Sequence, residues 1–152
     1  MSVLFEHARE AGAGMSRSGY SHDLEPWSLI CWRGAVKSAI RGKRGQRFLR
    51  DIIDALDALP EKKLAAGNLV SADGCCAMGA VAIHKGIDVS GIDPYERDQV
   101  ASLFDISEAL AAEIADLNDD EQWCRPERQS DAANKRWHRM RNWAESNLKE
   151  QL

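Results

Sequence analysis

Apolar side chains recur every three or four positions from Pro26 onward, which is the spacing of one face of an α-helix. In the first such segment they are Leu29, Trp32, Val36 and Ile40. In the second they are Phe48, Leu49, Ile52, Ile53, Leu56 and Leu59, and the stripe stops at Pro60. Gly42 and Gly45 interrupt the pattern between the two segments. The spacing predicts two antiparallel helices joined by a short elbow.

Three later helices are predicted from their start and stop signals. Asp93 is the expected cap of a helix that begins at Pro94, and Ser107 is the expected cap of the next. Their expected apolar positions are Val100, Leu103, Phe104, Leu110, Ile114 and Leu117. The last helix should begin between Pro126 and Ser130 and bury Ala133, Trp137, Met140 and Trp143. Its opposite side should be basic, with Lys135, Arg136, Arg139 and Arg141.

Residues 69–77 allow two interpretations. The pair Asp73-Gly74 is a strong turn signal, so the short apolar runs on either side could form a β-hairpin. Alternatively, these residues form a loop that caps a helix running from Cys76 to His84, which Gly86 would end.

The predicted fold is mainly α: a compact bundle of five or six helices, with a short hairpin near residues 69–77 as an option. At 152 residues and 44 % hydrophobic composition, the chain is long enough for one core, so we expect one helical domain over residues 22–150. Residues 1–21 should form a flexible arm. No run of 18 apolar residues and no secretion signal is present, so we expect a cytoplasmic protein without a membrane segment.

Charge is unevenly distributed along the chain. Seven cations and no acid lie between Arg33 and Arg50, although the whole chain carries −4, so the other residues sum to about −11. The candidate binding residues, called the basic elbow below, are Arg33, Lys37, Arg41, Lys43, Arg44 and Arg47. Such a cluster suits an anionic partner, either nucleic acid or an acidic protein face.

The non-functional alternatives are that these cations form a solvated face, or that Arg33, Lys37 and Arg41 pair with acids of the second helix. The available acids are Asp51, Asp54, Asp57 and Glu61. The same aspartates would repel phosphate, which weakens the hypothesis that this helix reads bases in a DNA groove.

The cysteines suggest a second kind of chemistry. Cys75 or Cys76 at a helix start could be a nucleophile, because unpaired backbone N–H groups stabilise a thiolate. Candidate bases and orienting groups are His22, His84, His138, Asn118 and Asp119. Packing of small thiols in a core is the alternative, and we expect Cys31, Cys75, Cys76 and Cys124 to be free thiols. No metal site or cofactor is predicted. Trp27 and Trp123 lie off the apolar stripes.

Several segments resemble a family of small uncharacterised proteins encoded by phages and prophages of proteobacteria. They are Ser16 to Ser21, Trp27 to Val36, Arg41 to Gln46, Cys76 to Val81, Asn118-Asp119 and Arg136 to Trp143. The resemblance extends from Met15 to Trp143 and implies an accessory protein of the bacterial cytoplasm. It carries no known activity, so no site residue follows from it.

The sequence thus favours a non-enzymatic accessory protein that uses the basic elbow to bind a host or phage assembly, such as a defence nuclease or transcription complex, or its nucleic acid. The alternatives are a cysteine-dependent hydrolase or transferase using Cys75 or Cys76, and a small DNA-binding regulator. The oligomeric state is left open.

Overall fold

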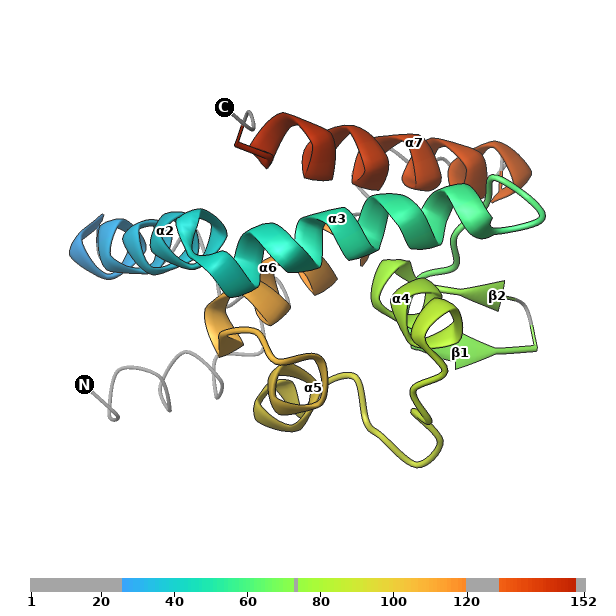
Figure 1. The fold of residues 1–152 in the computed structure, drawn as a ribbon, viewed down its shortest axis with the longest axis horizontal. Coiled ribbons are helices and arrows are strands. Elements are labelled where there is room, and N and C mark those ends of the chain that lie inside the picture. The colour runs from blue at the N-terminus through green and yellow to red at the C-terminus, as the bar shows by residue number, and fades with distance from the viewer. Residues whose placement is uncertain (1–25, 73, 120–128, 150–152) are drawn as a thin grey trace.

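The computed structural model describes residues 26–72, 74–119 and 129–149, which form six helices and one two-stranded antiparallel sheet (Figure 1). The elements in chain order are α2 (Pro26–Arg41), α3 (Lys43–Ala58), β1 (Val70–Ser71), β2 (Gly74–Cys75), α4 (Ala77–Lys85), α5 (Arg97–Phe104), α6 (Glu108–Asp119) and α7 (Gln129–Asn147). The prediction of a helical bundle with a short hairpin is confirmed. The predicted arm, His22, Trp123 and Cys124 lie outside the described residues.

Helix α3 is the centre of the bundle, with α7 along one side and α4 along the other (Figure 1). Its predicted apolar stripe supplies four fully or almost fully buried side chains: Phe48, Leu49, Ile52 and Leu56. Burying each side chain of this size contributes about 1.5–3 kcal/mol. The ring of Phe48 also packs edge-on against Phe104 at a centroid distance of 5.7 Å, which joins α5 to the same core.

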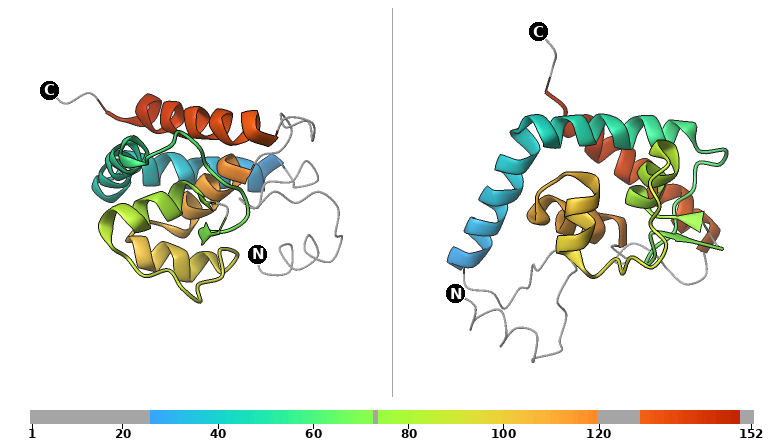
Figure 2. Two further views of the ribbon diagram at one scale, coloured as in Figure 1. Left: turned by 90° about the vertical axis from the view of Figure 1, so that its right-hand side faces the viewer. Right: turned by 60° about the horizontal axis from the view of Figure 1, so that its bottom comes forward.

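Helices α2 and α3 meet in a corner rather than in a hairpin, as the right-hand view of Figure 2 shows. The prediction that they run antiparallel is therefore wrong. One residue, Gly42, separates them, and a reversal between helices needs a loop of about 2–5 residues. Helix α2 turns away from α3 and packs on α6, where Val36 is its buried residue.

The segment before α4 satisfies both interpretations of residues 69–77. Val70 pairs with Cys75 and Ser71 with Gly74 in the hairpin. Cys76 follows directly and caps α4, its sulfur accepting a hydrogen bond from the Gly79 amide at 3.4 Å. Gly86 ends the helix in the left-handed conformation, with φ of 69°, as predicted.

The cap of α6 was predicted correctly from the sequence, but the start of α5 was not. Ser107 Oγ accepts from the Leu110 amide at 3.1 Å, so the predicted cap of α6 is confirmed. Helix α5 begins at Arg97 rather than Pro94, because Asp93 Oδ1 accepts from the Tyr95 amide at 2.9 Å. This side-chain bond holds residues 93–96 in a turn that precedes the helix.

Two of the four cations predicted on the basic side of α7, Arg136 and Arg139, bind backbone carbonyls inside the fold, which corrects the sequence-based expectation for them, whereas Lys135 is exposed as predicted. Arg136 is buried and donates to the carbonyl oxygens of Asn118 at 2.6 Å and Leu64 at 2.9 Å. Arg139 donates to the Leu117 carbonyl at 2.9 Å. These carbonyls lie at the C-terminal end of α6 and in the loop after α3, where no helical amide is available to them. The two guanidinium groups therefore serve the fold.

Candidate binding surface at the corner of α2 and α3

The corner depends on a close approach between the two helices. Gly45, in the first turn of α3, is buried, and a Cβ built on it would lie 2.0 Å from the Ala39 carbonyl oxygen. No side chain fits in that space, so glycine is required at this position. Gly42, the single linking residue, has extended backbone angles and provides no side-chain cap for α3.

Gln46 connects this corner to the C-terminal end of α7 through hydrogen bonds. Its Nε2 donates to the carbonyl oxygens of Ile40 at 2.8 Å and Asn147 at 3.0 Å, and its Oε1 accepts from the Lys149 amide at 2.8 Å. Lys149 also donates from Nζ to the Arg41 carbonyl at 2.6 Å. These bonds from the end of α7 therefore fix the direction in which α2 leaves the core. They also place Lys149 at the corner, a cation that the sequence analysis did not include.

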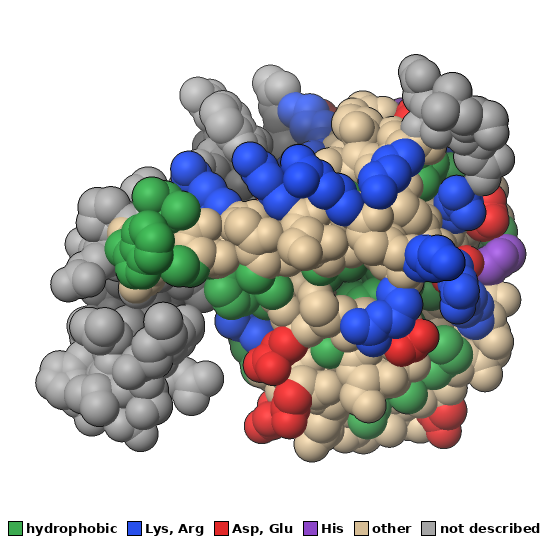
Figure 3. All heavy atoms as spheres, turned by 60° about the vertical axis from the view of Figure 1, so that its left-hand side comes forward, with side chains coloured by type: hydrophobic (Ala, Val, Ile, Leu, Met, Phe, Trp, Pro, Cys, Tyr) green, Lys and Arg blue, Asp and Glu red, His purple; other side chains and the backbone are tan. Residues whose placement is uncertain are grey.

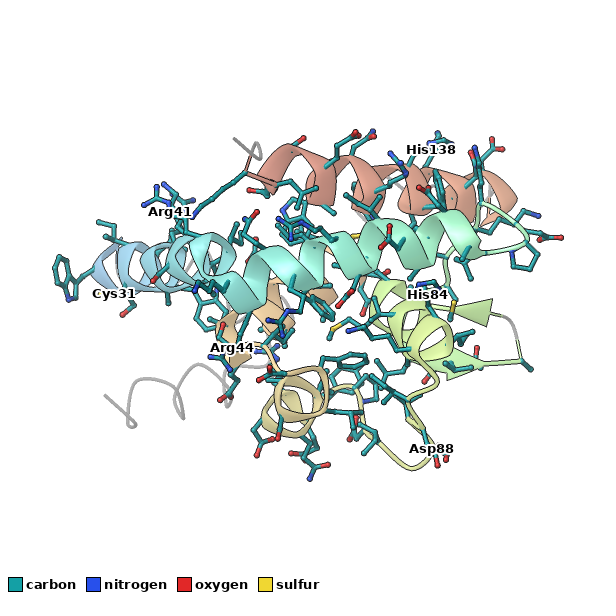
Figure 4. All side chains as sticks on the ribbon, in the orientation of Figure 1. Cys31, Arg41, Arg44, His84, Asp88 and His138 are labelled. Atoms are coloured by element: carbon teal, nitrogen blue, oxygen red, sulfur yellow. The ribbon has the colours of Figure 1, made fainter. Side chains whose placement is uncertain are left out.

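The six side chains of the basic elbow are all exposed. On α2 the cations recur every fourth residue, at Arg33, Lys37 and Arg41, so they share one face and are spaced about 6 Å apart along the helix axis. Figure 3 shows Lys and Arg side chains in a row beside α2 and around its junction with α3. Arg41 and Arg44 point away from opposite sides of the bend (Figure 4).

Few internal acids neutralise this surface. Arg44 approaches Asp105 at 3.2 Å, but both side chains are largely exposed, at 61 % and 70 %, so the pair contributes only about 0–1 kcal/mol. Within the described ranges 26–72, 74–119 and 129–149, the other five members of the basic elbow form no ion pair.

Three of the four acids expected as partners, Asp51, Asp57 and Glu61, pair with other cations. Asp51 pairs with Lys85 at 2.6 Å, and Asp57 accepts two hydrogen bonds from Arg141 at 2.7 and 3.0 Å. The Arg141 guanidinium lowers the pKa of Asp57 below its ordinary value. The interpretation in which the aspartates of α3 neutralise the elbow is therefore wrong for the part of the chain that the structure describes.

Local electrostatics at the start of α3 work against the helix. Its first turn contains Lys43 and Arg44 and no acid, although the N-terminus of a helix carries the equivalent of about +0.5 charge. Cations at this position destabilise a helix, and an acid would stabilise it. The arrangement concentrates positive potential at the corner in a way that folding does not require.

Burial disfavours the thiolate form of both adjacent cysteines. Burial raises the pKa of Cys76 to about 11 and also raises the pKa of Cys75. The negative charge of Asp119 raises the pKa of Cys76 further. The cavity beside Cys76 has a volume of about 20 Å³, which is room for one or two water molecules rather than a substrate.

Two of the proposed partners of the cysteines, Asn118 and Asp119, line the same cavity as Cys76. Asn118 is buried, where its Oδ1 accepts from the Ala77 amide at 3.0 Å and its Nδ2 donates to the Ala65 carbonyl at 3.0 Å. His84 and His138 are exposed on α4 and α7 (Figure 4). Cys31, Cys75 and Cys76 are free thiols, as predicted. Among the described residues, no three His, Cys, Asp or Glu side chains gather as metal ligands would.

The chain matches no protein-family model, no curated protein and no solved structure. In the described part of the chain, no helix has the combination of length and apolar character needed to cross a membrane.

Proposed function

We propose that this chain is a non-enzymatic accessory protein that docks its basic elbow on a negatively charged surface of a larger assembly. The observation that carries the proposal is that five of the six elbow cations are exposed and have no ion pair among the described residues. Cations that form no internal ion pair lose little stabilisation when they bind an external anion.

The rigidity of the corner supports the same proposal. Gly45 and Gln46 hold α2 and α3 in one relative direction through a close backbone contact and the hydrogen bond from Gln46 to the Ile40 carbonyl, and two further hydrogen bonds join Gln46 to the end of α7. Cations on a fixed frame lose less conformational entropy on binding than cations on a loop. The remaining charge of about −11 repels polyanions elsewhere, so it would favour approach through this one surface.

The biological setting is proposed from the resemblance of the sequence to phage and prophage proteins. In that setting the partner would be a host or phage assembly of the bacterial cytoplasm, such as a nuclease or a transcription complex. A cysteine-dependent activity receives no support from the raised thiol pKa of Cys76.

The test compares two double charge reversals. Lys43→Glu with Arg47→Glu removes two elbow cations, and Lys63→Glu with Lys135→Glu makes the same change of net charge at exposed positions away from the corner. Each variant is used for affinity capture from infected or lysogenic bacteria, with and without nuclease. We expect the elbow variant to retain less than about a tenth of the captured partner and the control to retain all of it.

Stability should move in the opposite direction to binding. Glu at position 43 lies in the first turn of α3, where a negative charge is favourable by about 0.3–1 kcal/mol, so the elbow variant should be at least as resistant to urea as the parent protein. Equal capture by both variants would refute the docking proposal. Capture that nuclease abolishes would indicate nucleic acid, and capture that it leaves intact would indicate protein.

A further inference from the structure

We infer that the exposed face of α2 is the part of this surface that selects the partner, and that the partner is an acidic amphipathic helix of another protein. The inference rests on the proposed function and adds the chemical class of the partner. Helix α2 contributes few buried side chains to the core: within positions 27–41, Val36 is the one residue that is buried.

The exposed face of α2 combines apolar and cationic side chains. Trp27 is 66 % exposed and Ile30 is 58 % exposed, and both precede the row Arg33, Lys37 and Arg41 on the same helix. Figure 3 shows the result as a hydrophobic cluster at one end of α2 with the Lys and Arg row continuing from it. Exposed tryptophan and arginine on one face are typical of residues that dominate protein–protein binding energy.

Nucleic acid fits this face less well. The whole chain is acidic, with a pI near 5.6, whereas nucleic-acid-binding domains are usually basic, with a pI above about 9. A duplex backbone would engage the cations but would leave the side chain of Ile30 in water. A second copy of this chain fits poorly as well, because a symmetric pairing would set the row of cations against its own copy.

An acidic helix matches both parts of the face. Carboxylates at every fourth position repeat about every 6 Å along a helix axis, which is the repeat of Arg33, Lys37 and Arg41. An apolar residue at the end of that helix would cover Trp27 and Ile30. The exposed positions 34, 35 and 38, interspersed with the cations, are Gly, Ala and Ser, so these positions add no bulky side chain beside the row of cations.

The inference is tested with two labelled probes in roughly 150 mM salt. One is a helix-forming peptide of about 20 residues with Glu at every fourth position and two Leu at one end. The other is a DNA duplex of about 20 base pairs of arbitrary sequence. We expect the peptide to bind more tightly than the duplex by about tenfold or more, as measured by fluorescence anisotropy.

Variants separate the two parts of the face. Arg33→Glu with Lys37→Glu should weaken peptide binding at least about tenfold, and a peptide with Lys in place of Glu should restore it. Trp27→Ala with Ile30→Ala should weaken peptide binding by about fivefold or more and leave duplex binding unchanged. Alkylation of Cys31, which is exposed on the same helix, should slow when the peptide is bound. Circular dichroism confirms that each variant is folded.

The outcomes distinguish this inference from the proposed function. Tighter binding of the duplex, failure of the peptide to bind, or no effect of the Trp27 and Ile30 changes would overturn the acidic-helix inference. In those cases, loss of cellular capture in the variant with Glu at positions 43 and 47 would still support docking through the elbow. Full capture by that variant would reject the proposed function itself.

Discussion

Gln46 donates a hydrogen bond of 3.0 Å to the carbonyl oxygen of Asn147, although 101 positions separate the two residues. The contact joins the first turn of α3 to the last residue of α7. Since Gln46 also binds the Ile40 carbonyl at the end of α2, one side chain coordinates three helix ends at the corner. The direction of α2, and with it the placement of the basic elbow, depends on this amide.

Replacing Gln46 by Ala should therefore destabilise the protein. Three hydrogen bonds are lost, and the backbone groups they satisfied are left in a partly buried place, so the free energy of unfolding should fall by about 2–3 kcal/mol. Urea denaturation measures the change. Gln46→Glu is the matched variant: it keeps an acceptor for the Lys149 amide, loses both donors, and should remain clearly less stable than the parent. A parental midpoint for both would show that the corner does not depend on this residue.

Two glycines provide a contrast between a crowded and an open position. Gly45→Ala places a Cβ against the Ala39 carbonyl and should cost about 3 kcal/mol or more. Gly34→Ala, in the exposed middle of α2, adds a Cβ that would meet nothing within 4 Å beyond the adjacent residues and backbone of its own helix, so it should stabilise the helix by about 0.5–1 kcal/mol. Thermal melts of the two variants should shift in opposite directions, and equal shifts would contradict the geometry of the corner.

Asn118 is expected to be the most sensitive polar residue in the core. Alanine at this position leaves the Ala77 amide and the Ala65 carbonyl without their partners, so unfolding should become easier by about 2–4 kcal/mol. Hydrogen exchange at the start of α4 should accelerate in the same variant. Asn142→Ala, a change of the same residue type at an exposed position of α7, should alter stability by no more than about 0.5 kcal/mol.

The cysteines should differ widely in reactivity. A pKa raised from 9.0 to about 11 reduces the thiolate fraction of Cys76 about 100-fold near pH 8, whereas Cys31 is exposed. Mass spectrometry after brief iodoacetamide treatment of the native protein should find the label on Cys31 and almost none on Cys76. Rapid labelling of Cys76 would revive the hypothesis of a cysteine-dependent enzyme.

The ion pair between Asp57 and Arg141 should be visible in the pH dependence of stability. Since the folded pKa of Asp57 is lowered from 3.8, its contribution is present above that value and is lost as the pH falls through the folded pKa. At neutral pH, Asp57→Asn should cost up to about 1 kcal/mol, and the difference from the parent should vanish in strong acid. The control is Asp54→Asn, which changes an exposed acid on the same helix and should alter the free energy of unfolding at neutral pH by no more than about 0.5 kcal/mol.

Much of the local structure follows from the sequence. The apolar stripe of α3, the Ser107 cap, the left-handed Gly86 and the turn of the hairpin each depend on residues within about four positions of one another. The spacing of Arg33, Lys37 and Arg41 on one face of α2 is local in the same sense. Periodicity and capping are short-range properties of the backbone, so they can be inferred without knowing the rest of the fold.

Only the tertiary structure decided which charges are internal. Arg136 and Arg47 are indistinguishable as residues, yet one is buried against the Asn118 and Leu64 carbonyls and the other is exposed. The direction of α2 depends on the contact of Gly45 with Ala39 and on the bond from Gln46 to Asn147. Asn147 reaches Gln46 only when segments that are distant along the chain pack together. The pattern along the chain therefore determined where the cations are, and packing determined which of them stay exposed to solvent.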